Sequence, residues 1–180
     1  MGLILQVAPP SKVFLRPFAA QVQQELEKQL HYSIPTDTPS RRRYESHDLP
    51  WSGWASLQEL AASVLGEDKI PHLLAVEAWQ GVYLPISIEP TEVWIGDNPT
   101  PLQCASLKAL IRELEQFADT QSLPVWSKEL EDLGNELQER WESSDYDLDK
   151  EPDEALETYI QLMIAARVAD QHNLPLWVVK

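Results

Sequence analysis

The chain has 180 residues, 43% of them hydrophobic and 24% charged, and a formal net charge of -15. These proportions are typical of a globular protein and exclude a disordered or fibrous chain, and the length suits a single globular domain over 1–180. The negative charge argues against direct binding of nucleic acid or of an anionic membrane, because both need Lys and Arg side chains to displace counterions. Most of the excess negative charge lies in residues 91–180.

Cysteine content and the N-terminal stretch bear on the compartment. Cys104 is the only cysteine, so the chain can form neither an internal disulfide nor a zinc or redox site from paired thiols. The opening MGLILQVAPPSK lacks a basic flank, and its apolar run is too short for a secretory signal. No stretch approaches the roughly 18 apolar residues needed to cross a bilayer. We therefore expect a cytoplasmic protein without membrane association of its own.

The first half of the chain predicts a strand, two helices and a long loop. The apolar run at 3–8 is closed by two prolines and predicts a strand. Apolar side chains at four-residue spacing over 18–30 predict a helix. The Pro/Ser-rich stretch 33–50 has no sustained periodicity and predicts a long loop. A helix over 56–65 follows, with Ser56 as its cap and Gly66 at its end.

The clearest β signal follows that helix. HLLAVEAW and VYLPISIE are two β-rich runs joined by Gln80-Gly81, which predicts an antiparallel hairpin over 72–89. EVWI at 92–95 could add a third strand beside it. Three strands with one covered face are enough for a stable sheet.

Helices dominate the second half. Amphipathic patterns predict helices over 107–118, 126–141 and 156–168, and the broad apolar stripe of the last predicts the most buried helix. LWVVK at 176–180 predicts a final strand. Together the patterns predict an α+β fold with a small antiparallel sheet, including the hairpin, covered by about five helices.

Two stretches of the second half resemble each other. FADTQSLPVW at 117–126 and VADQHNLPLW at 168–177 share Ala, Asp, Leu, Pro and Trp in register. Each stretch predicts a helix end followed by a polar turn, and its Pro prevents the helix from continuing. The match is either a duplicated helix-and-turn unit or a coincidence.

The most acidic stretch is DYDLDKEPDE at 145–154, and its alternating carboxylates raise the question of a calcium loop. Such a loop needs Gly at its sixth position and a bidentate carboxylate at its twelfth. Counting from Asp145, these positions hold Lys150 and Leu156, so the match fails. We favour an acidic linker over 143–151, followed by a helix that begins at Pro152. Weak divalent-cation binding is compatible with this interpretation.

Other chemistry is sparse, and we predict no catalytic residue, no metal ligand and no cofactor. The four histidines have no metal-ligand spacing, and there is no Gly-rich phosphate loop. Cys104 beside a His47-Asp48 pair could be imagined as a thiol nucleophile, but a lone cysteine is far more often part of the packing.

Tryptophan supplies the remaining candidates. Trp126, Trp141 and Trp177 lie on apolar stripes and are expected in the core. Trp51 and Trp54 have no evident stripe of their own. We favour a core or stapling role for this pair over the alternative of an interface hot spot.

The function favoured by these patterns is a non-enzymatic adaptor, assembly factor or inhibitor that binds a basic protein partner through its acidic second half. The candidate interaction residues are Trp51, Trp54, Asp145, Asp147, Asp149 and Glu151. A different class is an enzyme or small-molecule-binding domain whose site lies near 44–54 and gathers Tyr44, His47, Trp51 and carboxylates. Weaker alternatives are a divalent-cation-binding protein and a mimic of nucleic-acid charge.

Overall fold

The computed structural model describes residues 2–34, 41–77, 80–143 and 150–180, and of residues 150–152 only the backbone. Within these ranges the chain forms a mixed sheet of six strands and six α-helices, which confirms the α+β class. The sheet is larger than predicted and not wholly antiparallel. No helix in these ranges is both long enough and apolar enough to cross a membrane.

The strands are β1 (Ile4–Val7), β2 (Tyr44–Glu45), β3 (Gly81–Leu84), β4 (Thr91–Val93), β5 (Leu102–Ser106) and β6 (Leu176–Val179). The helices are α1 (Arg16–Leu30), α2 (Trp51–Leu65), α3 (Pro71–Ala75), α4 (Leu107–Gln121), α5 (Ser127–Glu142) and α6 (Lys150–His172), with short 3-10 turns at Pro10–Lys12 and Glu67–Lys69. The strand order is β2-β1-β6-β3-β5-β4, and only the β3–β5 pair is parallel. The first strand of the chain, β1, and the last, β6, thus pair with each other in the interior of the sheet.

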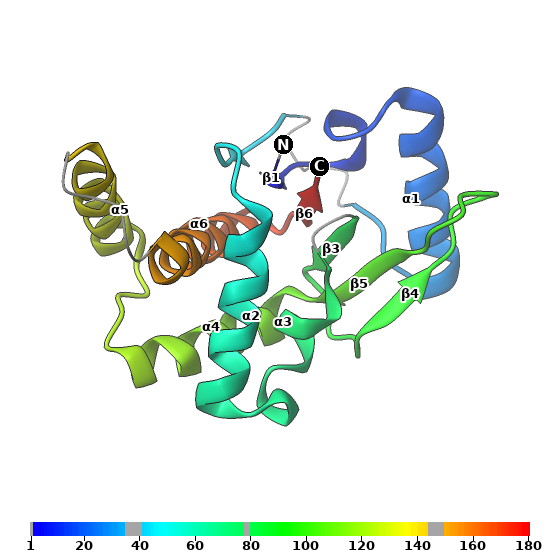
Figure 1. The fold of residues 1–180 in the computed structure, drawn as a ribbon. Coiled ribbons are helices and arrows are strands. Elements are labelled where there is room, and N and C mark those ends of the chain that lie inside the picture. The colour runs from blue at the N-terminus through cyan, green and yellow to red at the C-terminus, as the bar shows by residue number, and fades with distance from the viewer. Residues whose placement is uncertain (1, 35–40, 78–79, 144–149) are drawn as a thin grey trace.

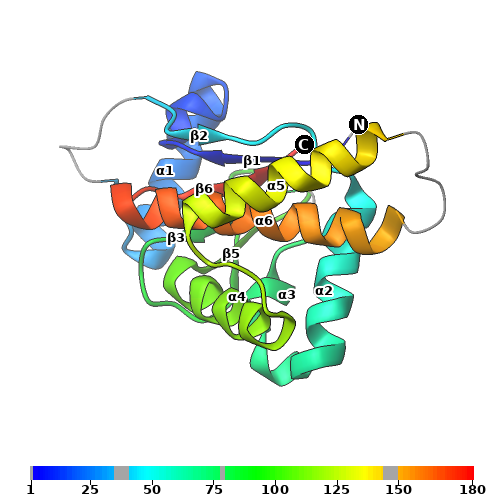
Figure 2. The ribbon, with the colours of Figure 1, turned by 90° about the vertical axis from the view of Figure 1, so that its left-hand side faces the viewer.

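Alternation of side chains along the strands gives the sheet two apolar faces. Val82 and Trp177 belong to the smaller core, which α1 covers. Leu5, Tyr83 and Val178 belong to the larger core, which α2, α3, α4 and α6 cover. Figure 1 shows α1 on one side of the sheet and these helices on the other, with α5 beyond α6 as an outer layer, and Figure 2 shows α5 lying along α6.

The predicted hairpin over 72–89 is wrong. Its first arm forms the short helix α3, with Pro71 in the first turn, where the missing N–H costs nothing. Its second arm, β3, pairs with β6 and β5, which are distant in sequence. A Cβ on Gly81 would lie 2.1 Å from Val76 Cγ1, so this glycine permits a close approach of two segments. Residues 78–79 lie outside the described ranges.

The predicted helices are confirmed, but α2 starts earlier than expected. It begins at Trp51, five residues before the predicted cap Ser56, and ends at Gly66, whose φ is +91°. A Cβ on Gly53 would lie 2.5 Å from Thr158 Oγ1 and 2.8 Å from the carbonyl oxygen of Glu154. The stretch WSGW is therefore the first turn of a helix that crosses α6 closely, and β2 lies within the segment 33–50 that was predicted as a loop.

The two stretches that resemble each other, 117–126 and 168–177, end their helices with the same geometry. After α4, Ser122 has a φ of 53° and the N–H of Leu123 donates to Ala118, and after α6, Asn173 has a φ of 52° and the N–H of Leu174 donates to Ala169. These are the bonds of the common left-handed helix ending. Helix α1 ends in the same way at His31 without the sequence match. The shared residues thus accompany the same helix ending, and the chain then continues differently, into α5 in one case and into β6 in the other.

A buried hydroxyl gives a test of the larger core. Tyr83 is fully buried, and its hydroxyl has no hydrogen-bond partner among the described residues. An unpaired buried polar group costs stability, so Tyr83→Phe is expected to raise the free energy of unfolding by about 1 kcal/mol. Tyr159→Phe is the matched control, because the Tyr159 hydroxyl donates to the carbonyl of Pro124 at 2.7 Å and its loss should be destabilising. Urea unfolding measures both, and a loss of stability in Tyr83→Phe would contradict the assignment.

Candidate functional site

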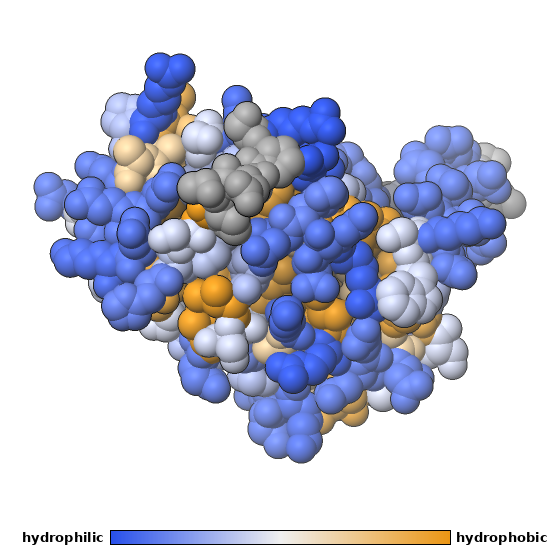
Figure 3. All heavy atoms as spheres, turned by 180° about the vertical axis from the view of Figure 1, so that it is seen from behind, coloured by the Kyte–Doolittle hydropathy of each residue, from blue (hydrophilic) through white to orange (hydrophobic). Residues whose placement is uncertain are grey.

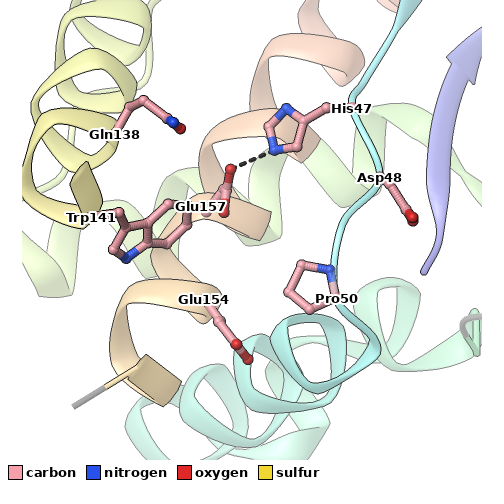
Figure 4. Close-up of a pocket in the computed structure, with 7 residues that line it drawn as sticks. All are labelled: His47, Asp48, Pro50, Gln138, Trp141, Glu154 and Glu157. Atoms are coloured by element: carbon pink, nitrogen blue, oxygen red, sulfur yellow. Dashed lines mark hydrogen bonds and ion pairs between the residues drawn. The ribbon is translucent and has the colours of Figure 1, made fainter. Parts of the chain in front are cut away.

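A groove of about 470 Å³ opens between α5, α6 and the segment that precedes α2. We call it the acidic groove, and Figure 4 shows its lining. The lining residues are His47, Asp48 and Pro50 from that segment, Gln138 and Trp141 from α5, and Glu154 and Glu157 from α6.

Local structure explains why these side chains meet. Leu49 is fully buried and exchanges two backbone hydrogen bonds of 2.9 Å with Leu3, which fixes the segment against the sheet. Gln138 and Trp141 are three residues apart on α5, as are Glu154 and Glu157 on α6, and this spacing places each pair on one helical face. Three parts of the chain therefore form the groove: the segment that precedes α2, one face of α5 and one face of α6.

An imidazole and a carboxylate form the centre of the groove. His47 Nε2 lies 2.5 Å from Glu157 Oε1, and the Glu157 side chain is only 10% exposed, whereas that of His47 is 53% exposed. The hydrogen bond to Glu157 raises the pKa of His47 above its usual 6.5, with smaller contributions from the Glu157 and Asp48 charges, and burial opposes the rise. The pair stabilises the fold below pH 6.5, and this contribution is lost as the pH rises through the raised pKa.

The other carboxylates are arranged around this pair. Glu154 accepts a hydrogen bond from the Ser52 hydroxyl in the first turn of α2. In Figure 4 the indole of Trp141 lies beside Glu157, and the Asp48 side chain points away from the centre toward the rim. The groove thus combines the carboxylates of Glu154 and Glu157 with the indole of Trp141.

A second cavity of about 260 Å³ adjoins the acidic groove, with which it shares His47, Gln138 and Glu157. We call it the apolar slot, after Leu130, Gly134 and Leu137 of α5 and Ile160 and Ile164 of α6. The polar side chains that also line it are Glu131, Asn135 and Gln161.

The structure separates the two tryptophans of the WSGW stretch. Trp54 is 2% exposed, and its Nε1 donates to the carbonyl of Val76 at 3.0 Å. Its alternative role as an interface residue is therefore wrong, because its side chain is part of the core. Trp51 is partly exposed, and the Lys180 ammonium lies 5.9 Å from its ring centroid.

The acidic candidates are only partly placed. Asp145, Asp147 and Asp149 lie outside the described ranges, and Glu151 is described only as backbone within α6. Helix α6 begins at Lys150, so it includes the last two residues of the segment predicted as an acidic linker.

The thiol hypothesis is not supported. Cys104 lies within β5, and it packs on the face of the sheet that α1 covers. Burial raises the pKa of its thiol to about 12, whereas a nucleophilic cysteine needs a lowered pKa. His47 belongs to the groove between α5 and α6, so the two side chains do not form a catalytic pair.

The tryptophans expected in the core differ in their surroundings. Trp177 is fully buried as predicted, and Trp141 is half-buried at the groove. The prediction for Trp126 is wrong, since its side chain is 63% exposed. The guanidinium of Arg167 lies 4.5 Å from the Trp126 ring centroid and also pairs with Glu115 at 2.7 Å. A cation over its ring is a favourable contact for an indole at the surface.

The structure brings together only some of the residues of the alternative site near 44–54. The Tyr44 hydroxyl donates to Gln161 of α6, and His47 lies in the acidic groove, but Trp51 is not among the residues that line it. Within the part of the chain that the structure describes, no three His, Cys, Asp or Glu side chains are placed to hold a metal ion.

Sequence reasoning missed the residues that α5 and α6 contribute. Gln138 and Trp141 were part of a helical pattern, and Glu154 and Glu157 were part of the next, without a sign that these faces meet His47. The i, i+3 spacing of the two glutamates beside an aromatic helix was the one available signal. The contact itself joins residues 110 positions apart in the chain.

Comparison with protein-family models, with curated protein sequences and with solved structures finds no match for this chain. The side chains of the acidic groove therefore indicate what it can bind.

Proposed function

We propose that this chain is a non-enzymatic binding module that holds a basic segment of a partner protein, with a Lys or Arg side chain in the acidic groove. The observation that carries the proposal is the composition of that groove. Its described lining includes Asp48, Glu154, Glu157 and the Trp141 indole, and it includes no Lys or Arg. Such a lining attracts a cation and offers no counter-charge of its own except His47.

Two physical effects support a cationic ligand. Carboxylates pair with ammonium and guanidinium groups through charge-assisted hydrogen bonds, which are stronger than neutral ones. A cation over the face of a Trp ring gains about 0.5–2 kcal/mol, depending on its desolvation. The net charge of -15 adds a long-range attraction that speeds the encounter with a basic surface. The adaptor, assembly or inhibitory role and the cytoplasmic location are part of this proposal.

Binding of a basic peptide tests the proposal directly. A fluorescein-labelled Arg-Ser repeat peptide should bind at low salt, and Glu154→Gln should weaken its affinity by roughly three- to tenfold, because one carboxylate of the groove is neutralised. Fluorescence anisotropy measures the affinity, and added salt should weaken it.

The matched control is Glu59→Gln. Glu59 is exposed on α2 and does not line the groove, so the variant makes the same change in net charge elsewhere. If both variants bind the peptide equally well, the attraction comes from the overall charge and the groove is not the binding site.

A second candidate function is the binding of a small molecule, and the His47–Glu157 pair favours it. A histidine oriented by a carboxylate beside a cavity can exchange protons with a ligand. The volume of about 470 Å³ also falls within the usual range of ligand sites, about 300–1,000 Å³. A thermal-shift screen of small molecules would separate the two functions, because ligands of this kind should lose their effect in His47→Gln.

A further inference from the structure

Gly134 is unusual in its place on α5. It lies in the interior of a helix that runs from Ser127 to Glu142, and glycine is among the weakest helix formers. Its φ is not positive, so the backbone does not require glycine. A Cβ at this position would meet Ile160 Cγ2 at 3.6 Å, which is an ordinary van der Waals distance. Alanine would thus fit against α6 and strengthen the helix.

The missing side chain does have one effect, which is on the apolar slot. Gly134 is part of the wall of this cavity, and aliphatic side chains from both helices surround it. A larger residue at 134 would project into the space of about 260 Å³ between α5 and α6. The slot adjoins the acidic groove and shares His47, Gln138 and Glu157 with it, so one bound segment can reach both.

We infer that the apolar slot receives an aliphatic side chain from the same partner segment whose basic side chain enters the acidic groove. The inference rests on the proposed function, and it narrows the partner to a segment in which basic and aliphatic residues alternate closely. Charge complementarity identifies this occupant, because Glu131 and Glu157 stand beside the aliphatic residues of the slot. Glu157 already pairs with His47, so the exposed carboxylate of Glu131 is the further partner for a basic segment, and both charges would repel an acidic one.

Two labelled peptides test the inference against the full chain. The first is the Arg-Ser repeat, and the second is the same peptide with every second Ser replaced by Leu. The Leu-containing peptide should bind the wild type roughly tenfold more tightly, because an aliphatic side chain leaves water. In Gly134→Leu, which fills the slot from within, this gain should disappear, while the Arg-Ser peptide should bind as it does to the wild type.

Two further variants guard against trivial explanations. Gly134→Ala should raise the midpoint of thermal unfolding, because alanine is the better helix former. It should also reduce the gain in affinity that Leu gives the peptide. A purely structural role of Gly134 would not produce higher stability together with weaker binding. Gln24→Leu places an additional leucine on the exposed surface of α1, on the other side of the sheet, and should leave the gain unchanged.

The possible outcomes separate the inference from the proposed function. If the Arg-Ser peptide binds but Leu adds nothing, or if the gain persists in Gly134→Leu, the slot inference is overturned and the proposed function stands. If neither peptide binds at low salt, the proposed function fails and the inference fails with it. If Gly134→Leu instead changes the sedimentation of the free protein, the slot is filled by a second copy of the chain, and this also overturns the inference.

Discussion

Trp54→Ala is expected to lower the free energy of unfolding by about 3–5 kcal/mol, the usual cost of removing a large aromatic side chain from a core. Trp54 is 2% exposed, and its side chain packs from α2 into the larger core. Its indole also donates a hydrogen bond to the carbonyl of Val76. Urea unfolding followed by circular dichroism measures the loss.

Two companion variants show which property of Trp54 matters. Trp54→Phe keeps most of the apolar side chain and removes the N–H donor, but Gln58 Nε2 also donates to the Val76 carbonyl at 3.1 Å, so the loss should be much smaller. Trp94→Ala removes a side chain that is 53% exposed and should change stability little. If Trp54→Ala unfolds like Trp94→Ala, Trp54 is not a core residue, and the WSGW stretch is again a candidate interface.

The helices could be predicted because their signals are local. A repeat of three and four residues in apolar side chains is visible within one stretch of sequence, and α1, α4, α5 and α6 appear where this repeat occurs. The start of α2 was missed because Trp51 to Gly53 show no stripe. Gly53 lies where α2 approaches the backbone of α6, and only the tertiary contact shows that a glycine is needed there.

The sheet could not be predicted to the same extent because its pairings are distant. Strand β3 is buried along its whole length between β6 and β5, and β5 carries the small residues of LQCAS, which show no marked alternation. A buried strand and a buried short helix look alike in an apolar run, which is how α3 was mistaken for a strand. The Gln80-Gly81 pair then suggested a turn, but Gly81 is instead the point where the start of β3 lies too close to the Val76 side chain for a Cβ.

The candidate site shows the same limit. The acidic character of the second half was evident from composition, and His47 was named as part of an alternative site. The groove nevertheless depends on α5 lying along α6, and nothing in either helical pattern indicates which faces meet. Trp141 and Glu157 became site residues only through this packing.

The buried carboxyl group of Glu113, on α4, should have a second large and measurable effect, on the pH dependence of stability. The Glu113 side chain of α4 accepts hydrogen bonds from the backbone N–H groups of His72 at 3.0 Å and Leu73 at 2.7 Å, in the first turn of α3. Burial raises the pKa of Glu113 from 4.5 to about 7, although these hydrogen bonds and the charge of Arg112 act to lower it. The protonated form is therefore favoured in the folded state relative to the unfolded chain.

The direction of the pH effect follows from this difference. Between pH 4.5 and about 7 the folded protein binds a proton at Glu113 that the unfolded chain has released, so the free energy of unfolding falls as the pH rises through this range. The difference between the two pKa values corresponds to about 3 kcal/mol. His47 contributes in the same direction above pH 6.5, because its pKa is raised. His72 acts in the opposite direction, because burial lowers its pKa and its charging destabilises the fold at low pH.

Glu113→Gln isolates the contribution of this one carboxyl group. Gln cannot ionise, so the variant should lack about 3 kcal/mol of the decrease that the wild type shows between pH 4.5 and pH 8, whatever its stability at any single pH. Denaturant unfolding at a series of pH values gives both curves, and the difference between them cancels the titration of groups that the substitution leaves unchanged. Glu59→Gln removes an exposed carboxylate and should reproduce the wild-type pH dependence. Parallel curves for the wild type and Glu113→Gln would mean that Glu113 ionises as readily in the folded protein as in the unfolded chain, and that its two hydrogen bonds to α3 and the charge of Arg112 fully offset the cost of burying its charge.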